Sequence, residues 1–319
     1  MRLMLVIILM GLVMSHTQQE QTDALSLRSF AGLSRSGSNP IIPLNAGTYN
    51  SNGADVPYVR EAQLIGGTWY AITQANPSTD DWRNLALYTS TDLVTWTASG
   101  SNPVLTRTVG QDDHYLLHPA LIKIGATWNM YYSAMNAAGT AESIYRATAD
   151  DATFTSWTKQ GQVITDNVAV PIVILIGSLY HMYVAERTAD TQIRLYTSAD
   201  GVTWTRMGVV VAKGDWDQAT TRFNDPWIYQ NSDAKYELLY TAEFSSGVLQ
   251  RIGYAISRDG IHWKKKADTH VLTASGTGGA FDEAYVGDPC LLEYGGTTYL
   301  FYAGINSPGL LGQGGLATL

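Results

Sequence analysis

A repeated unit constrains the fold of this 319-residue chain more than any other feature. Four segments share an aspartate-centred turn that runs into a tryptophan: 89–96, 150–157, 197–204 and 256–263. The last two carry Asp-Gly at the turn, where glycine easily takes the positive φ that a tight hairpin requires. Internal repetition of this kind is typical of folds in which each unit is one small sheet.

A second pattern lies upstream of each tryptophan. It is an extended run that starts at an x-Pro pair, followed by a turn and a tyrosine-rich run, and it starts at His118-Pro119, Val170-Pro171, Asp225-Pro226 and Asp288-Pro289. A fifth, degenerate copy has Arg60 in place of the proline, and successive copies are 52 to 63 residues apart. Each copy predicts four strands, since proline is tolerated at the first position of a strand. The sequence therefore predicts an all-β fold, a five-bladed β-propeller of four-stranded antiparallel blades.

The ends of the chain are predicted to share one blade. The last unit stops at its third strand, at Leu319, whereas Ser38-Asn39-Pro40 matches Ser101-Asn102-Pro103 in the outer strand of the first unit. An N-terminal outer strand would close the ring and protect the sheet edge. The alternative is a chain truncated inside its last blade.

The first residues indicate export. An apolar run of 12 residues follows Arg2, which is too short to span a bilayer comfortably but suits a secretory signal. We expect a signal peptide at 1–15, a linker at 16–37 and the propeller at 38–319, in a secreted or periplasmic protein without stable membrane insertion after cleavage. An uncleaved anchor or a buried segment is the alternative.

Charge and cysteine content exclude several classes of function. The net charge of −8 and the absence of long Lys/Arg runs argue against a nucleic-acid partner. The single cysteine, Cys290, allows neither an intrachain disulfide nor a CxxC motif. We expect a monomer.

Acidic residues are predicted to converge on one face. Because the first strand of a blade begins where its antiparallel neighbour ends, residues at these two places ring the central depression. The candidate catalytic residues there are Asp225, Asp288, Glu61, Glu243 and Glu186. Paired carboxylates at a cleft suit glycoside hydrolysis, in which one protonates the leaving oxygen and the other activates water or attacks the anomeric carbon. The alternatives are turn-capping aspartates, solvated rim charges and, for Arg60 and Glu61, an internal ion pair.

A further set is predicted to bind substrate: His118, Arg60, Trp82, Trp227 and Asp113. His118 could hold a sugar hydroxyl or a central cation, or be an ordinary packed histidine. No cofactor is expected, although a structural cation such as calcium is compatible with the centre. The tryptophans at 96, 157, 204 and 263 recur in each unit and are assigned to packing, which leaves Trp82 and Trp227 for sugar stacking.

The pattern of x-Asp-Pro, Tyr-rich strand, Ser-x-Asp-Gly-x-x-Trp turn and Asn-Pro-hydrophobic strand resembles the five-bladed propeller superfamily of glycoside hydrolases, which includes arabinanases, xylosidases and invertase-like enzymes. The resemblance implies a base or nucleophile Asp from the first blade, a second Asp that orients substrate or tunes the acid, and a Glu acid. Asp225 matches the second Asp, and Glu243 or Glu186 could be the acid. The first blade departs from the pattern at Val59-Arg60-Glu61, where Glu61 or Asp55 would have to substitute.

These features favour an enzyme that hydrolyses glycosidic bonds of an oligo- or polysaccharide. Two alternatives remain open at this stage. One is a non-catalytic glycan-binding propeller that lost the first-blade Asp, and the other is a sialidase-like propeller with Asp-box-like turns. Five units and few arginines argue against the second alternative.

Overall fold

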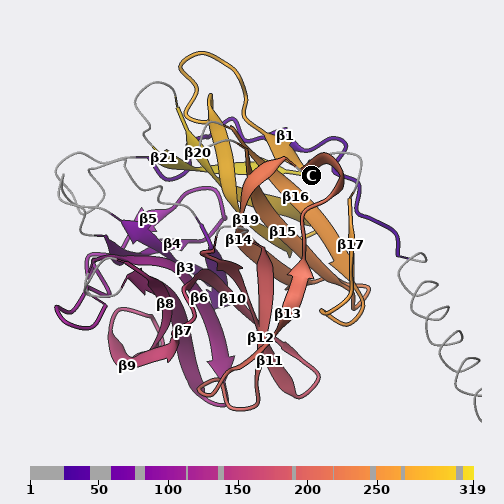
Figure 1. The fold of residues 1–319 in the computed structure, drawn as a ribbon. Coiled ribbons are helices and arrows are strands. Elements are labelled where there is room, and N and C mark those ends of the chain that lie inside the picture. Colours follow the sequence, from indigo (N-terminus) through magenta and orange to yellow (C-terminus); the bar gives the residue numbers. More distant parts are fainter. Residues whose placement is uncertain are drawn as a thin grey trace, which may run out of the picture.

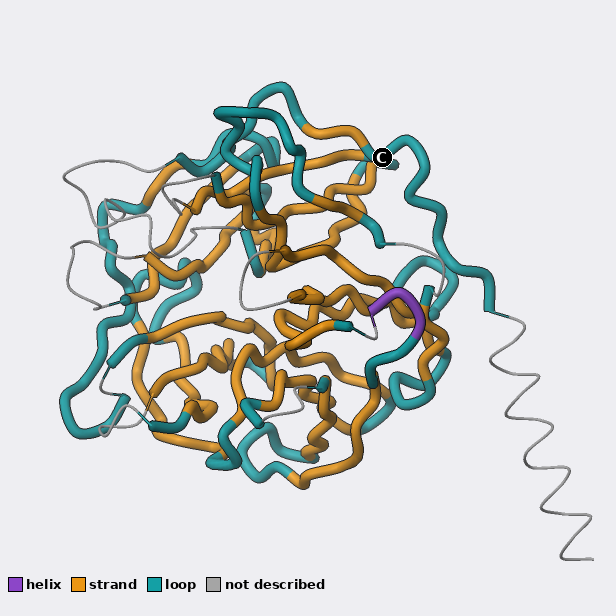
Figure 2. The backbone as a smooth tube through the Cα atoms, turned by 45° about the horizontal axis from the view of Figure 1, so that its top comes forward, coloured by secondary structure: helices purple, strands orange, loops and turns teal. Residues whose placement is uncertain are grey.

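The computed structural model describes residues 25–43, 59–75, 83–112, 114–135, 140–188, 192–217, 219–244, 249–266, 270–306 and 312–319. In these ranges the regular structure is strand throughout, apart from one helical turn, η1, at Asp215–Asp217 (Figure 2). No helix in the described part of the chain has the length and hydrophobicity needed to cross a bilayer. The predicted signal peptide lies outside the described residues.

Five antiparallel sheets form a ring of blades (Figure 1). Blade 1 contains β2 (Glu61–Ile65), β3 (Thr68–Ala75), β4 (Asn84–Ser90) and β5 (Thr97–Ala98). Blade 2 contains β6 (Leu116–Ile124), β7 (Thr127–Met135), β8 (Glu142–Ala149) and β9 (Trp157–Ile164). Blade 3 contains β10 (Val168–Ile176), β11 (Leu179–Glu186), β12 (Ile193–Ser198) and β13 (Thr205–Val211).

Blade 4 contains β14 (Thr220–Gln230), β15 (Tyr236–Phe244), β16 (Leu249–Ser257) and β17 (Trp263–Lys265), with β18 (Leu272–Thr273) also pairing with β16. Blade 5 contains β19 (Tyr285–Tyr294), β20 (Thr297–Ile305), β21 (Gly312–Thr318) and β1 (Ser34–Arg35). The five-bladed, all-β prediction is confirmed, and the six blades of a sialidase-like propeller are not what the chain forms.

The N-terminal segment closes the ring. Ser34 pairs with Thr318, and β1 lies beside β21 near the C-terminus (Figure 1). The Asn39 side chain accepts from the Leu316 N–H and donates to the Leu316 carbonyl, both at 2.8 Å. Asn102 makes the same pair of bonds to Leu87 in blade 1, at 2.7 and 2.9 Å. The predicted match between the two Asn-Pro segments is therefore a structural equivalence.

The closing segment begins before residue 38. Its strand starts at Ser34, and Leu25 is buried. Arg28 forms ion pairs with Glu237 of blade 4 at 2.7 Å and Glu293 of blade 5 at 2.5 Å. The second half of the segment expected as a linker thus packs against the propeller.

A buried tyrosine, aspartate and cation recur in blades 2, 4 and 5. In each, a second-strand tyrosine donates to an aspartate before the inner strand, and a cation on the outer strand pairs with it. The three sets are Tyr132-Asp112-Lys159, Tyr240-Asp217-Lys265 and Tyr302-Asp282-Arg35. Arg35 on β1 occupies the place that the outer-strand lysines occupy in the other two blades. The N-terminal strand therefore supplies side-chain chemistry as well as backbone pairing to blade 5.

The aspartate turn of blade 4 docks that blade on blade 3. Asp259 Oδ1 accepts from the backbone N–H groups of Ile261 and His262, both at 2.8 Å. Gly260 has a φ of +74° and its carbonyl accepts from Tyr183 of blade 3 at 2.7 Å. A Cβ on Gly260 would lie 2.4 Å from the Ile176 side chain, so this position requires glycine. Trp263 packs edge-on against Tyr183, which agrees with the packing role expected for the repeated tryptophans.

Candidate functional site

The residue before each inner-strand proline has the same unusual backbone. His118, Val170, Asp225 and Asp288 have φ values between 49° and 57°. Each lies where the pairing register of its inner strand shifts. A bulge of this kind re-aims a side chain, and left-handed backbone at a non-glycine residue is retained at functional or tightly constrained positions. The proline repeat thus positions one side chain per blade at equivalent places.

Three of these side chains meet. The His118 Nε2 atom lies 3.9 Å from Oδ1 of Asp225 and 3.9 Å from Oδ1 of Asp288. Potential ligand atoms of the three residues all lie within 4.8 Å of one another. His118 and Asp225 are buried, whereas the Asp288 side chain is 16% exposed and gives the cluster a solvent-facing side. We call these three residues the central cluster.

Backbone bonds between blades hold the cluster. The His118 N–H donates to Gln74 Oε1 of blade 1 at 3.3 Å, and the Asp288 N–H donates to Thr241 Oγ1 of blade 4 at 3.0 Å. In the described part of the chain, His118 Nδ1 and Asp225 Oδ1 have no hydrogen-bond partner. Buried polar atoms without partners are uncommon in folded proteins. The cluster therefore has bonding capacity available for a ligand.

Positive charge surrounds His118. Burial, followed by the guanidinium groups of Arg60, Arg187 and Arg83, holds the pKa of His118 well below its usual value. The imidazole is consequently neutral at physiological pH, with one nitrogen able to donate and the other able to accept.

Arg60 and Glu61 lie inside the ring. Arg60 is fully buried and donates to the carbonyls of Pro171 at 2.9 Å and Pro226 at 3.3 Å, which joins blade 1 to blades 3 and 4. Burial raises the pKa of Glu61 to about 8, although Arg60 and a hydrogen bond from Gln63 oppose this shift. The two residues predicted to line the site from blade 1 are thus interior groups in this structure.

The two remaining glutamates, Glu186 and Glu243, have different partners. Glu186 pairs with Arg194 of β12 and, at 3.0 Å, with Arg206 of β13, both in its own blade. Glu243 is buried, with Arg222 at 4.0 Å. It lies two residues beyond Thr241, on the same face of β15, and so about 7 Å further along the strand than the residue that bonds Asp288. Glu243 is therefore placed on the side of blade 4 that faces Asp288, whereas Glu186 is bound within blade 3.

Trp227 has a packing role here. It is buried, and its Nε1 donates to the Leu291 carbonyl of blade 5 at 3.2 Å. It joins blades 4 and 5, and its burial leaves little of the ring exposed to a sugar. Trp82 and Asp113 lie outside the described residues.

The sequence reasoning missed a polar group beside the cluster. Arg187 forms an ion pair with Glu142 and donates to Asn224 at 2.7 Å. Glu142 also accepts from the Tyr115 hydroxyl at 3.0 Å, and the Arg83 guanidinium lies 5.0 Å from the centre of the Tyr115 ring. Arg187 directly follows Glu186. The end of the second strand was therefore the sequence signal for this arginine, but the prediction chose the residue one position earlier.

Comparisons with known proteins agree with this architecture. Residues 61–170 match the family model described as "Glycosyl hydrolases family 43". The resemblance to five-bladed propeller glycoside hydrolases is confirmed. No curated protein matches the chain in sequence.

Solved structures share the fold of the chain over most of its length. A glycosyl hydrolase from Bacteroides ovatus is 16% identical with a TM-score of 0.73, and the match covers 92% of this chain and 95% of that one. A Cellvibrio cellulosa α-L-arabinanase complexed with arabinohexaose is 13% identical with a TM-score of 0.62, covering 83% and 92%. A β-1,2-mannobiose phosphorylase from Listeria innocua is 12% identical with a TM-score of 0.68, covering 90% and 96%. At these identities the likeness shows the fold alone.

Proposed function

We propose that this propeller glycoside hydrolase homologue cleaves glycosidic bonds of an oligo- or polysaccharide at the central cluster. The observation that carries the proposal is the approach of Asp225 and Asp288, from blades 4 and 5, to the same nitrogen of His118. Their positions are equivalent in the repeat, and both face the point where the inner strands meet.

The pair can perform hydrolysis with the atoms it offers. One carboxyl donates its proton to the glycosidic oxygen as the bond between that oxygen and the anomeric carbon breaks. The other carboxylate either takes a proton from water as the water oxygen bonds to the anomeric carbon, or bonds to that carbon itself. In the second case water, which gives its proton to the first carboxylate, then displaces the bonded carboxylate from the anomeric carbon. Neutral His118 is placed to hydrogen-bond a sugar hydroxyl and orient the ring. Glu243, on the adjoining strand, is a third acid on the Asp288 side.

Blade 1 supports a second candidate, a non-catalytic glycan-binding propeller. The resemblance implies an acidic residue in this blade, and here Arg60 fills the interior while Glu61 is buried beside it. Such a protein would bind a glycan without cleaving it.

A screen of neutral polysaccharides distinguishes these functions. The protein is incubated with arabinan, β-1,4-xylan and β-1,2-mannan, with and without inorganic phosphate, and released reducing sugars and sugar phosphates are measured. Hydrolysis predicts reducing sugars that do not depend on phosphate. Binding without release would support the glycan-binding alternative, and release that requires phosphate would contradict hydrolysis.

The central cluster also fits a cation, which we propose as a structural occupant in the non-catalytic alternative, because carboxylates that bind an ion cannot also exchange protons with a substrate. One histidine nitrogen and two carboxylate oxygens within 4.8 Å of one another can reach a common ion at the 2.3–2.6 Å typical of calcium. An ion held there would lock three blades together. We expect EDTA to lower the melting temperature and calcium to restore it, and the Asp288→Asn variant to lose this response. An unchanged melting temperature in EDTA would contradict a bound cation.

The remaining expectations follow from the N-terminus and the closed ring. We propose that the protein is exported to the periplasm or the medium and acts as a monomer. Cell fractionation and light scattering test these two points.

A further inference from the structure

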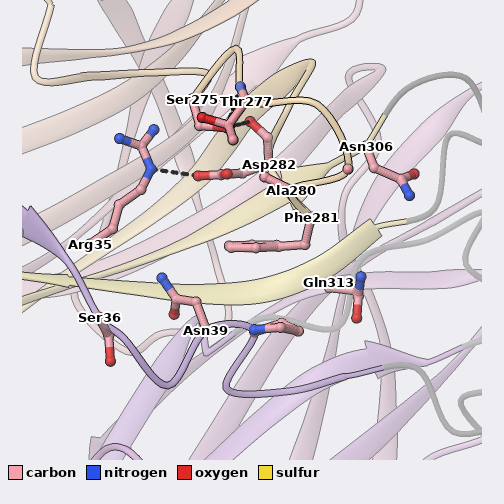
Figure 3. A pocket seen from close by; sticks show the side chains of 12 residues that line it. Arg35, Ser36, Asn39, Ser275, Thr277, Ala280, Phe281, Asp282, Asn306 and Gln313 are labelled. Carbon is pink, nitrogen blue, oxygen red and sulfur yellow. Dashed lines mark hydrogen bonds and ion pairs between the residues drawn. The ribbon is translucent and has the colours of Figure 1, made fainter.

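A cavity of about 480 Å³ lies at the seam where the N-terminal segment joins blade 5 (Figure 3). Its lining comes from three parts of the chain. These are the closing segment around Asn39, the loop of residues 275–282 before β19, and the facing strand ends at Asn306, just after β20, and Gln313, at the start of β21. We call it the seam cavity. Its volume is within the range of small-ligand pockets, about 300–1,000 Å³.

An aromatic ring forms part of the lining. The half-buried Phe281 lies against β20 and β21 above two glycines, because a Cβ on Gly304 or Gly315 would come within 2.4 or 2.6 Å of its ring. Neither glycine has a positive φ, so the backbone does not require them. The ring itself requires them, since any larger residue would displace it. Two strand glycines thus seat an aromatic ring in the cavity.

The other groups that line the cavity are mostly neutral and polar. Figure 3 shows the amides of Asn306 and Gln313 to one side of Phe281, whereas the Asn39 amide, which also lines the cavity, is already bonded to Leu316. The charged lining residues, Arg35 and Asp282, form an ion pair at 2.6 Å and neutralise each other. Amides and hydroxyls around an apolar ring suit a neutral, polyhydroxylated ligand, since sugars combine apolar C–H faces with hydroxyl edges.

The seam cavity faces the same end of blade 5 as the central cluster. Asn306 follows the end of β20, where Ile305 pairs with Tyr285, and Asp288 lies three residues further along β19. Blade 5 is four strands wide, so its outer strand lies about 14 Å from β19 at the usual strand spacing. A glycan chain cleaved at the cluster could extend over this blade into the cavity.

We propose that the seam cavity is a second glycan subsite, which binds neutral sugar residues of the polymer whose bond is cleaved at the central cluster. This inference rests on the proposed function, because cleavage at the central cluster sets where the glycan chain starts and the direction in which it extends. It adds a site for long substrates that the catalytic groups do not supply.

The test measures binding separately from cleavage. In an Asp225→Asn/Asp288→Asn background, affinities for arabinan, β-1,4-xylan, β-1,2-mannan and their disaccharides are measured by calorimetry. Two seam variants are compared, Asn306→Ala/Gln313→Ala, and Thr277→Trp, which fills the cavity from an exposed loop position. Gln160→Ala, an exposed amide on blade 2, is the matched control.

We expect both seam variants to weaken binding of one neutral polymer about tenfold, the effect of one or two lost hydrogen bonds. The seam variants should bind the disaccharide as tightly as the parent protein does. The control variant Gln160→Ala should bind the polymer as tightly as the parent protein does. In the active protein the same variants should raise KM for the polymer about tenfold and leave kcat unchanged. The proposal is overturned if no neutral polymer binds, if both seam variants bind like the control, or if polygalacturonate binds in preference. An Asp225→Asn/Asp288→Asn protein that stays active would refute the proposed function, and loss of polymer binding in the seam variants would still support the subsite.

Discussion

Glu61→Gln is expected to remove a large pH dependence of stability between pH 5 and pH 9. Glu61 is 3% exposed, and burial raises its pKa from 4.5 to about 8. Each pKa unit corresponds to about 1.4 kcal/mol, so ionising Glu61 in the folded protein costs about 5 kcal/mol relative to the unfolded chain. This is a large fraction of the about 5–15 kcal/mol that stabilises a typical domain.

The sign follows from proton binding. Between pH 4.5 and about 8 the folded protein holds the Glu61 proton while the unfolded chain has released it. The free energy of unfolding therefore falls as pH rises through this window and levels off above the folded pKa. Glutamine is neutral at every pH, so the variant lacks this slope.

Urea unfolding followed by tryptophan fluorescence at one-unit intervals from pH 5 to pH 9 measures the effect. From pH 5 to pH 9, the free energy of unfolding of Glu61→Gln should rise by several kcal/mol relative to that of the wild type. Asp233→Asn, at an exposed carboxylate, should follow the wild type throughout. Parallel curves for wild type and Glu61→Gln, within about 1 kcal/mol, would refute the buried, raised-pKa account of Glu61.

Two further stability predictions follow from the blade contacts. Gly260→Ala should lower the free energy of unfolding by about 2–3 kcal/mol, because it combines a positive φ with a close approach to the neighbouring blade, whereas Gly208→Ala, with open space around it, should not. Equal effects in urea titrations would contradict the docking role of the turn. Arg35→Met should cost about 2–3 kcal/mol by leaving the buried Asp282 without its cation, whereas Lys235→Met, in an exposed pair, should cost less than about 0.5 kcal/mol. A negligible loss in Arg35→Met would show that ring closure does not depend on this ion pair.

The repeat predicts the fold because its signals are local. A turn with Asp-Gly, a proline at a strand start and an Asn-Pro pair each fix a short stretch of backbone, and their recurrence fixes the number of blades. Ring closure could be predicted for the same reason, since Asn39 and Asn102 make the same side-chain bonds to the neighbouring strand. The strand pairing that begins at Ser34 carries no such signal.

The convergence of residues before the inner-strand prolines could be predicted, because equivalence within the repeat decides their positions. His118, Asp225 and Asp288 meet because the same bulge aims each of them. Depth along the ring axis is not encoded in the repeat, and so the sequence could not decide whether Arg60 and Glu61 line the site or form an internal pair.

Hydrogen-bond and ion-pair partners that lie on other strands also could not be predicted from the sequence. The arginines that bind Glu186 lie 8 and 20 residues further along the chain, and the carbonyl that accepts from Trp227 lies in the next blade. Both depend on strand register and blade contacts, which no short motif reports. The seam cavity is hidden for the same reason, because it brings residues 35–40 next to residues 275–313.

The most direct test of the central claim is the turnover of Asp225→Asn and Asp288→Asn on the neutral polysaccharide that the wild type cleaves. We expect each variant to fold, with an unchanged circular dichroism spectrum, and to lose about 10³-fold or more in kcat, since each substitution removes an acid or base from the reacting pair. The exposed Asp233→Asn should retain wild-type turnover. Wild-type turnover in either cluster variant would contradict the claim that this carboxylate pair carries the chemistry.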